Sequence, residues 1–175
     1  MTTPTLKTER IILRPLKLSD AKEVFKNWAT NPNVAKYMRW NTHQSIDETI
    51  EFLTSVEERI NDDKNYDWGF TLKETGELIG SGGAYYNDNE GMFEIGYCIM
   101  EEQWNKGLTT EAAKAMVDFV INKLQQTEVY ANCAWENINS GKILEKLGFA
   151  YTGDGEYKSF DEKRTFKSRN YHLTK

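Results

Sequence analysis

Long apolar runs, cysteines, histidines and prolines are all scarce in this chain of 175 residues. No apolar stretch approaches the roughly 20 residues that a membrane-spanning helix needs, so we expect no membrane partner. Residues 1–17 contain no apolar core followed by a small-residue cleavage site, and we expect no secretory signal. The two cysteines, Cys98 and Cys133, lie far apart in the sequence. A disulfide framework is therefore not expected, and we expect a cytoplasmic location, where the environment is reducing.

The chain lacks the residues that metal ligation and nucleic-acid binding need. The two histidines, His43 and His172, are isolated, whereas a zinc site takes three or four protein ligands, so we predict no metal site. A formal net charge of −5 argues against nucleic acid as a direct partner, because phosphate contacts need clustered Lys and Arg. The same charge is compatible with a cationic acceptor such as an amine, or with solubility alone.

Nothing in the sequence marks a domain boundary. It contains no internal repeat, no low-complexity tract and no Pro/Gly-rich linker, and its length suits one hydrophobic core. We therefore expect residues 1–175 to form a single domain.

Hydrophobic periodicity predicts the order of strands and helices. A strand at 10–16 precedes two helices, and each helix follows a capping-box pattern, Asp20 with Glu23 and Ser45 with Glu48. Three antiparallel strands are predicted at 66–72, 78–86 and 92–100, and then a helix of about 15 residues from 108. The remaining pattern predicts a strand at 129–135, a helix at 137–147, and strands at 149–153 and 165–173. This order is typical of an α/β domain with a mixed, mainly antiparallel sheet.

Segment 103–112 lies between a predicted strand and a predicted helix. Gly107 permits a positive φ or the close approach of a ligand, and Thr109 or Thr110 can cap the helix. A helix N-terminus has unsatisfied N–H donors and about half a positive charge, which suits a pyrophosphate. A plain capped loop explains the same pattern.

Three segments in order resemble the GNAT superfamily of N-acetyltransferases: EIGYCI at 94–99, WNKGLTTEA at 104–112, and NINS at 137–140 followed by EKLGF at 145–149. Two further segments, TERIILRPL at 8–16 and YMRW at 37–40, resemble the RimJ/RimL-like group of ribosomal-protein N-terminal acetyltransferases. The resemblance covers nearly the whole chain. It implies the GNAT fold, in which two central strands of the sheet splay apart and helices flank both faces.

The resemblance also implies acetyl-CoA as co-substrate. The pantetheine arm would lie between the strands at 92–100 and 129–135 and pair with the backbone of Ile99 and Met100. Asn132 and Asn137 would hold polar groups of the arm, and Lys142 would reach the 3′-phosphate. An N-cap role explains Asn137 equally, and a solvated surface position explains Lys142. The pyrophosphate would lie on the loop formed by Trp104, Asn105, Lys106, Gly107, Leu108, Thr109 and Thr110.

Two positions of that loop depart from the group's usual pattern. Asn105 stands where a Gly is usual, and Thr109 stands where an Ala is usual. We expect binding to survive, because Asn adopts the left-handed conformation more readily than most residues.

By the same resemblance, the chemistry is direct transfer of an acetyl group to a primary amine. An alkylamine with a pKa of about 10.4 is mostly protonated at neutral pH, so a base is needed, and Glu94 is the candidate. An ordinary solvent-facing Glu explains that position as well. Ser140 is the candidate hydrogen-bond donor to the departing thiolate, and a backbone N–H near Ile99 would stabilise the oxyanion. Trp40 and Tyr85 either shape the acceptor site or belong to the core.

The acceptor stays open at this point. A protein N-terminal amine, a small amine (polyamine, amino acid or antibiotic) and a non-catalytic CoA-binding sensor domain are the alternatives. Glu94 and Ser140 favour an enzyme over a sensor. Monomer and homodimer are equally compatible with the sequence.

Overall fold

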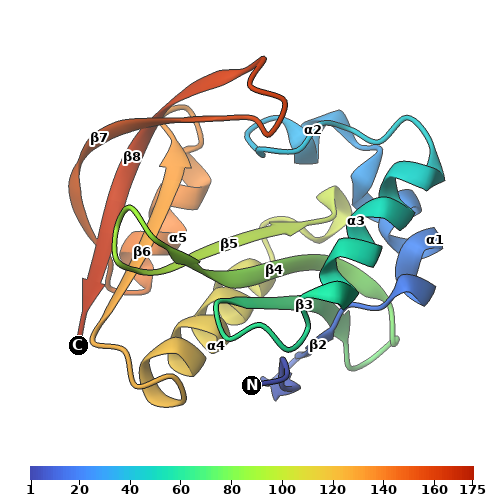
Figure 1. Cartoon of the computed structure of the whole chain (residues 1–175), viewed down its shortest axis with the longest axis horizontal. Coiled ribbons are helices and arrows are strands. Elements are labelled where there is room, and N and C mark those ends of the chain that lie inside the picture. Colours follow the sequence, from blue (N-terminus) through green and yellow to red (C-terminus); the bar gives the residue numbers. More distant parts are fainter.

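An eight-stranded sheet with helices on both faces forms the centre of the computed structural model, which describes residues 1–175 (Figure 1). The strand order is β1-β2-β3-β4-β5-β6-β8-β7, and every neighbouring pair is antiparallel except β5 and β6. The predicted fold class is therefore confirmed. The strands are β1 (Leu6–Lys7), β2 (Ile11–Pro15), β3 (Asn65–Leu72), β4 (Leu78–Asn87), β5 (Met92–Ile99), β6 (Glu128–Ala134), β7 (Ala150–Lys158) and β8 (Thr165–Thr174).

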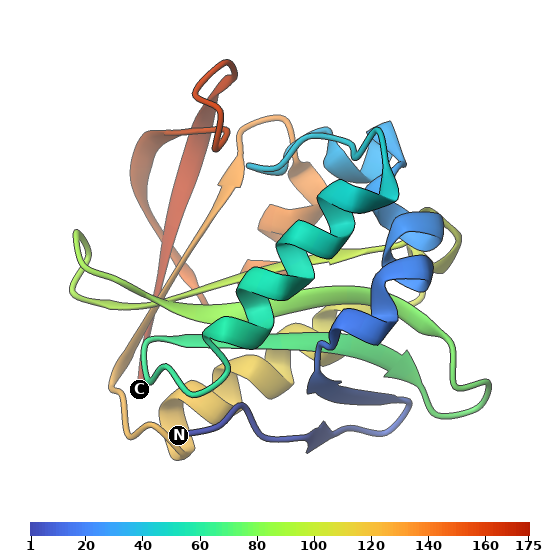
Figure 2. The ribbon, with the colours of Figure 1, turned by 45° about the vertical axis from the view of Figure 1, so that its right-hand side comes forward.

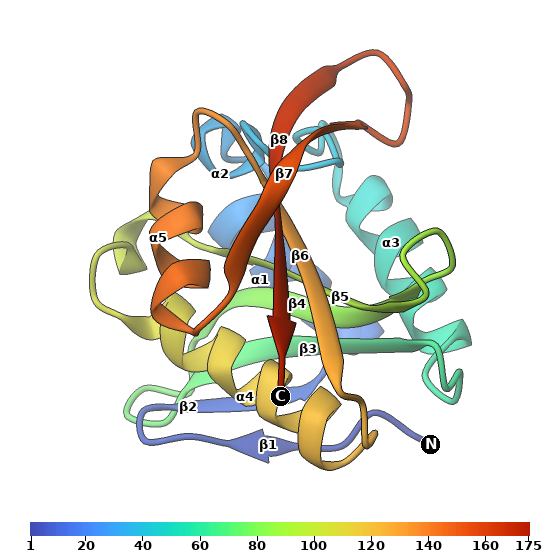
Figure 3. The ribbon, with the colours of Figure 1, turned by 90° about the vertical axis from the view of Figure 1, so that its left-hand side faces the viewer.

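Two groups of helices cover the two faces of the sheet. Figure 2 shows α1 and α3 lying over one face, and Figure 3 shows α4 and α5 against the other. The apolar side of α4, with Ala112, Met116 and Val120 fully buried, packs on β5 and its neighbours. No helix combines the length and the apolar character that crossing a membrane requires. The helical elements are η1 (Leu18–Asp20), α1 (Ala21–Val24), the π-helical η2 (Phe25–Ala29), α2 (Pro32–Ala35), α3 (Ile46–Glu58), η3 (Glu101–Gln103), α4 (Leu108–Asn122) and α5 (Ile138–Lys146).

The first helical region differs from its prediction. It is divided into η1, α1, η2 and α2, and the capping box predicted between Asp20 and Glu23 is wrong. Asp20 instead binds both terminal nitrogens of Arg14, at 2.8 and 2.9 Å, and accepts the backbone N–H of Lys17 at 2.9 Å in the capping box of η1. The capping box between Ser45 and Glu48 is confirmed at the start of α3.

The parallel ladder between β5 and β6 contains only two residue pairs. Phe93 lies opposite Val129 and Glu94 lies opposite Tyr130, and the pairing ends there. Beyond these pairs the two strands are not paired with each other, as expected for the splay that the resemblance implied, and we call this unpaired stretch the β5–β6 opening. It begins after Glu94 and Tyr130 and includes the end of β5 that leads into η3 (Figure 3).

Backbone groups line this opening on both sides. The N–H of Met100 donates to Ile79, and antiparallel ladders alternate between bonded and non-bonded pairs. This alternation directs the N–H and C=O groups of Tyr97 and Ile99 away from β4 and toward β6. By the same rule, the backbone of Asn132 in β6 faces β5. The opening therefore resembles an exposed sheet edge inside the molecule.

Candidate active site

The loop before α4 presents a run of free backbone donors. Asn105 has φ 60° and Gly107 has φ 77°, and α4 begins at the next residue, Leu108. None of the loop, cap or side-chain hydrogen bonds of the chain uses the six N–H groups from Asn105 to Thr110. The predicted cap by Thr109 or Thr110 is wrong, because both lie inside the first turn and Gly107 is the N-cap. Successive N–H groups around a left-handed residue form an anion-binding concavity.

The turn between β1 and β2, residues 8–10, contacts this loop, and we call this turn the strap. The guanidinium of Arg10 donates to the carbonyl of Lys106 at 2.9 Å and to Glu111 at 2.8 Å. The hydroxyl of Thr8 donates to the same carboxylate at 2.6 Å. Burial opposes ionisation of Glu111, but the hydrogen bonds from Thr8 and Arg10 outweigh it and lower the pKa of this carboxyl. Sequence reasoning missed this contact, because about 100 residues of chain separate its two halves and no local spacing connects them.

Ser140 lies on the α4–α5 side of the opening. Asn137 is the N-cap of α5 and accepts the N–H of Ser140 at 3.2 Å, which confirms the N-cap reading of Asn137. The hydroxyl of Ser140 is 3.1 Å from the hydroxyl of Tyr97 on β5. Burial raises the pKa of Tyr97, so this phenol stays protonated at neutral pH. Tyr97 was not among the predicted site residues.

Glu94 lies on the opposite face of the same strand. Its carboxylate accepts a hydrogen bond from Asn87 at 2.8 Å, and the guanidinium of Arg39 is 4.0 Å away. The side chain is 20% exposed. Two residues along β5, a Cβ built on Gly96 would meet no atom within 4 Å, so there is open space over the strand beside Glu94. A small molecule can therefore reach this carboxylate.

A bridge closes over the face that carries Glu94. We use this name for loop 36–41 and the tip of the β7–β8 hairpin, which extends toward α2 (Figure 1). Arg164 donates to the carbonyls of Met38 and Trp40 at 3.0 and 2.9 Å. The N–H of Phe160 donates to the loop at 2.8 Å. These bonds hold Trp40, a predicted acceptor-site residue, half-buried beside the core.

The predicted pantetheine contacts at Ile99 and Met100 differ in whether their backbone groups face the opening. The carbonyl of Ile99 points into the opening, where it accepts the indole N–H of Trp104 at 2.9 Å. The N–H of Met100 is not free, because it donates to Ile79, and its carbonyl already accepts from Gln103. The predicted pairing through the Met100 N–H is therefore unavailable, and Tyr97 is the residue whose backbone faces the opening instead.

Three other predicted residues lie around the site. Asn132 is half-buried, and its side chain is 3.4 Å from the hydroxyl of Tyr130. Lys142 is exposed on α5 without a hydrogen-bond partner. Tyr85 lies opposite Glu94 in the β4–β5 ladder, but its hydroxyl donates to Asp67 at 2.7 Å. Tyr85 can contribute its ring to the acceptor face, and its hydroxyl has a structural partner.

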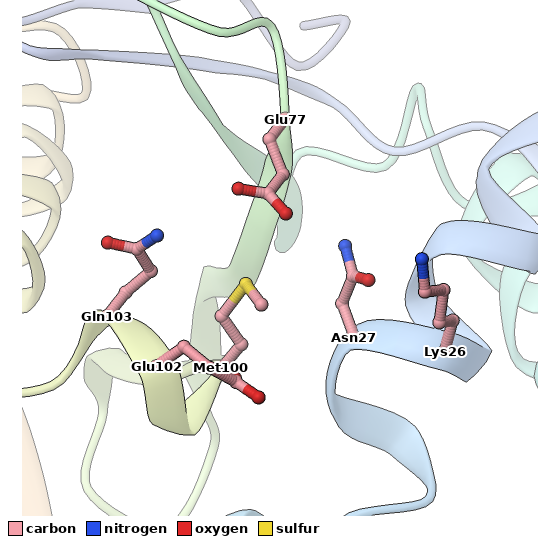
Figure 4. Close-up of a pocket in the computed structure, with 6 residues that line it drawn as sticks. All are labelled: Lys26, Asn27, Glu77, Met100, Glu102 and Gln103. Atoms are coloured by element: carbon pink, nitrogen blue, oxygen red, sulfur yellow. The ribbon is translucent and has the colours of Figure 1, made fainter.

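A cleft of about 340 Å³ opens between η2 and η3 (Figure 4). Lys26 and Asn27 line one side of it, opposite Met100 and Glu102, and Glu77 and Gln103 complete the lining. It contains neither Glu94 nor Ser140 and none of the free donors of the loop before α4. The cleft is therefore separate from the arrangement around the β5–β6 opening.

Comparison with known proteins places this chain among acetyltransferases. A family model described as "Acetyltransferase (GNAT) domain" matches residues 10–150. The uncharacterized N-acetyltransferase p20 of Bacillus licheniformis is 31% identical over 150 residues, which cover 85% of this chain and 84% of that protein.

Solved structures share the fold at lower identity. A structure described as a putative ribosomal-protein-serine acetyltransferase from Vibrio cholerae superposes with a TM-score of 0.86 at 19% identity, over the whole of both chains. The spermidine N-acetyltransferase from Vibrio cholerae, solved with CoA and spermine, gives 0.77 at 20% identity and covers 94% of this chain and 95% of that one. One fold thus serves proteins named for very different acceptors, and the acceptor has to be argued from the site.

Proposed function

Since the chain belongs to the GNAT acetyltransferase domain family and is an N-acetyltransferase, we propose that it transfers the acetyl group of acetyl-CoA directly to a primary amine at the β5–β6 opening. The observation that carries this proposal is the run of free N–H groups from Asn105 to Thr110. A diphosphate placed there gains several charge-assisted hydrogen bonds and the favourable end of the α4 dipole.

The opening fits the rest of the donor molecule. Its backbone groups at Tyr97, Ile99 and Asn132 suit the two amides of a pantetheine arm, which would add between β5 and β6 as an extra strand. Lys142 and the amide nitrogen of Asn137 are free for more distant polar groups of the donor. The residues present therefore fit acetyl-CoA.

The proposed base and the proposed hydrogen-bond donor to sulfur lie on opposite faces of β5. Glu94 accepts the proton of the attacking amine on the bridge side, directly or through water. The N–H of Ile99 faces the opening and stabilises the oxyanion as the thioester carbonyl is attacked. Ser140 donates a hydrogen bond to the departing sulfur on the other side, and Tyr97 holds its hydroxyl. No covalent enzyme intermediate is needed.

Two classes of acceptor follow from different observations. The segments at 8–16 and 37–40 support membership of the RimJ/RimL-like group, and with it a protein N-terminal amine and a cytoplasmic location. Within the second candidate class, small amines, the guanidinium of Arg39 beside Glu94 favours an amine that also carries a carboxylate. Both classes use the same donor site and the same two catalytic residues.

The first experiment measures acetyl-CoA binding by calorimetry in wild type and in Gly107→Glu. A carboxylate at this position meets the donor phosphates, while only Arg10, at 3.4 Å from the added Cβ, is near enough to be disturbed. We expect binding to be lost and the fold retained. Gly91→Glu is the matched control, because Gly91 has a similar φ of 70° and lies in the distant β4–β5 turn. Normal affinity in Gly107→Glu would disprove the phosphate-loop assignment.

The second experiment follows thiol release with a panel of amines and N-terminal peptides. Glu94→Gln is expected to lower turnover and to change its pH profile, while acetyl-CoA binding stays intact. Glu90→Gln, in the exposed turn before β5, removes the same charge nearby and serves as control. If the rate and the pH profile of Glu94→Gln match those of wild type, Glu94 is not the base.

A further inference from the structure

Arg39 differs from every other arginine of the chain. Of the six arginines, the other five donate hydrogen bonds through their guanidinium groups, whereas Arg39 donates none. Its only charged neighbour within 4.0 Å is Glu94, at the limit of an ion pair. The side chain is 41% exposed. A guanidinium has five N–H donors, so Arg39 presents an unused donor set beside the candidate base.

The bridge holds Arg39 in this position. Its guanidinium lies 5.2 Å from the centre of the Tyr157 ring, and its carbonyl accepts the N–H of Phe160 at 2.8 Å. Tyr157 is in turn anchored, since its hydroxyl donates to the carbonyl of Tyr37 at 2.6 Å. This cation–π contact holds the guanidinium near the ring and uses none of its N–H donors. The guanidinium is thus held in position while its N–H groups have no acceptor.

We propose that Arg39 binds a carboxylate of the acceptor while the amine of the same molecule lies at Glu94. This assignment rests on the proposed function, since it identifies the acceptor class of that site. The guanidinium edge matches a carboxylate in bidentate geometry. A polyamine would instead bring a second positive charge toward Arg39, which like-charge repulsion disfavours.

The geometry limits the separation of the two acceptor groups. Arg39 and Glu94 are 4.0 Å apart. With a hydrogen bond of about 2.9 Å at each end, the amine nitrogen and the carboxylate oxygen lie at most about 10 Å apart. Free amino acids satisfy this limit, and so does a peptide N-terminus with an acidic side chain in its first residues.

Matched acceptors test the assignment through kcat/KM. Each carboxylate acceptor is compared with its amide: glycine with glycinamide, a series of ω-amino acids of increasing length with their amides, and peptides with Asp against Asn at the second position. Spermidine is the polycationic probe. We expect wild type to prefer the carboxylate member by about 10-fold or more, because hydrogen bonds to charged groups are the strong ones. The amino-acid and peptide arms distinguish the two sources of the carboxylate.

Two variants attribute the preference to Arg39. In Arg39→Gln the preference is expected to fall to about 1- to 2-fold, with unchanged acetyl-CoA affinity, as expected for the loss of a single charged hydrogen-bond partner. Lys36→Gln removes an exposed charge from the same loop and should keep the full preference. Turnover without a carboxylate preference, or an equal loss on both members of a pair, overturns the assignment of Arg39 alone. No turnover with any acceptor overturns the proposed function and this assignment with it.

Discussion

The contact between Tyr97 and Ser140 allows a quantitative prediction of how far kcat falls when the Tyr97 hydroxyl is removed. The hydroxyl of Tyr97 is 3.1 Å from that of Ser140, and this is the one hydrogen bond that the phenol makes. Tyr97→Phe removes this bond and keeps the ring that packs beside the core. A neutral hydrogen bond contributes about 0.5–1.5 kcal/mol. If the bond orients Ser140 toward the sulfur, kcat should fall by about 2- to 12-fold.

A double-mutant cycle separates this orientation from simple packing. Ser140→Ala alone is expected to lower kcat, because the departing thiolate loses its donor. Adding Tyr97→Phe to Ser140→Ala should cause no further loss, since Tyr97 acts only through Ser140. The KM for acetyl-CoA should stay unchanged throughout. Tyr86→Phe is the control, because it removes a hydroxyl that donates at 3.0 Å to the carbonyl of Gly91, in the β4–β5 turn.

The assay is steady-state thiol release at saturating acetyl-CoA with the preferred acceptor. An equal loss from Tyr97→Phe in wild type and in the Ser140→Ala background would refute the reasoning, because the effect would then come from packing. A normal kcat in Ser140→Ala would remove Ser140 from the donor role.

Three further outcomes are expected. Arg10→Gln should weaken acetyl-CoA binding several-fold in calorimetry, because the negative charge of Glu111 in the first turn of α4 loses its partner; an unchanged affinity would mean that the strap is dispensable. Arg164→Gln leaves two loop carbonyls without their donor and should lower the free energy of unfolding by about 1–3 kcal/mol in urea, and a wild-type midpoint would contradict this. Burial raises the pKa of Cys98 to about 11, so at pH 8 only about one thiol in a thousand is ionised. Alkylation followed by mass spectrometry should therefore be slow in the native protein and faster as pH rises toward 11, and rapid labelling at pH 7 would show that the thiol is accessible and ionised.

Local features of the site could be read from single residue types. The left-handed conformations of Asn105 and Gly107, the N-cap at Asn137 and the capping box at Ser45 were predicted and are confirmed. Each depends on the conformational preference of one residue, or on a side chain bonding to backbone within three positions. Such terms act within a few residues and need no distant partner.

Three predictions failed, and two of them failed on features within a few residues. Asp20 was expected to form a capping box with Glu23 and instead binds Arg14, and Gly107 is the N-cap in place of Thr109 or Thr110. Met100 was expected to face the opening, but its bond to Ile79 turns it the other way. Each outcome depends on the folded backbone, which brings Asp20 to Arg14, starts α4 at Leu108 and pairs Met100 with β4.

The sequence alone predicted most of the order of elements and named the candidate phosphate loop, Glu94 and Ser140, because these depend on periodicity, local backbone preference and family motifs. Only the tertiary structure brought Tyr97 to Ser140, Arg10 to the loop before α4, and Arg39 to Glu94. These pairs are separated by tens of residues, and no local energy term links them. They meet because sheet order and the bridge place distant segments side by side, which is a property of the packed core as a whole.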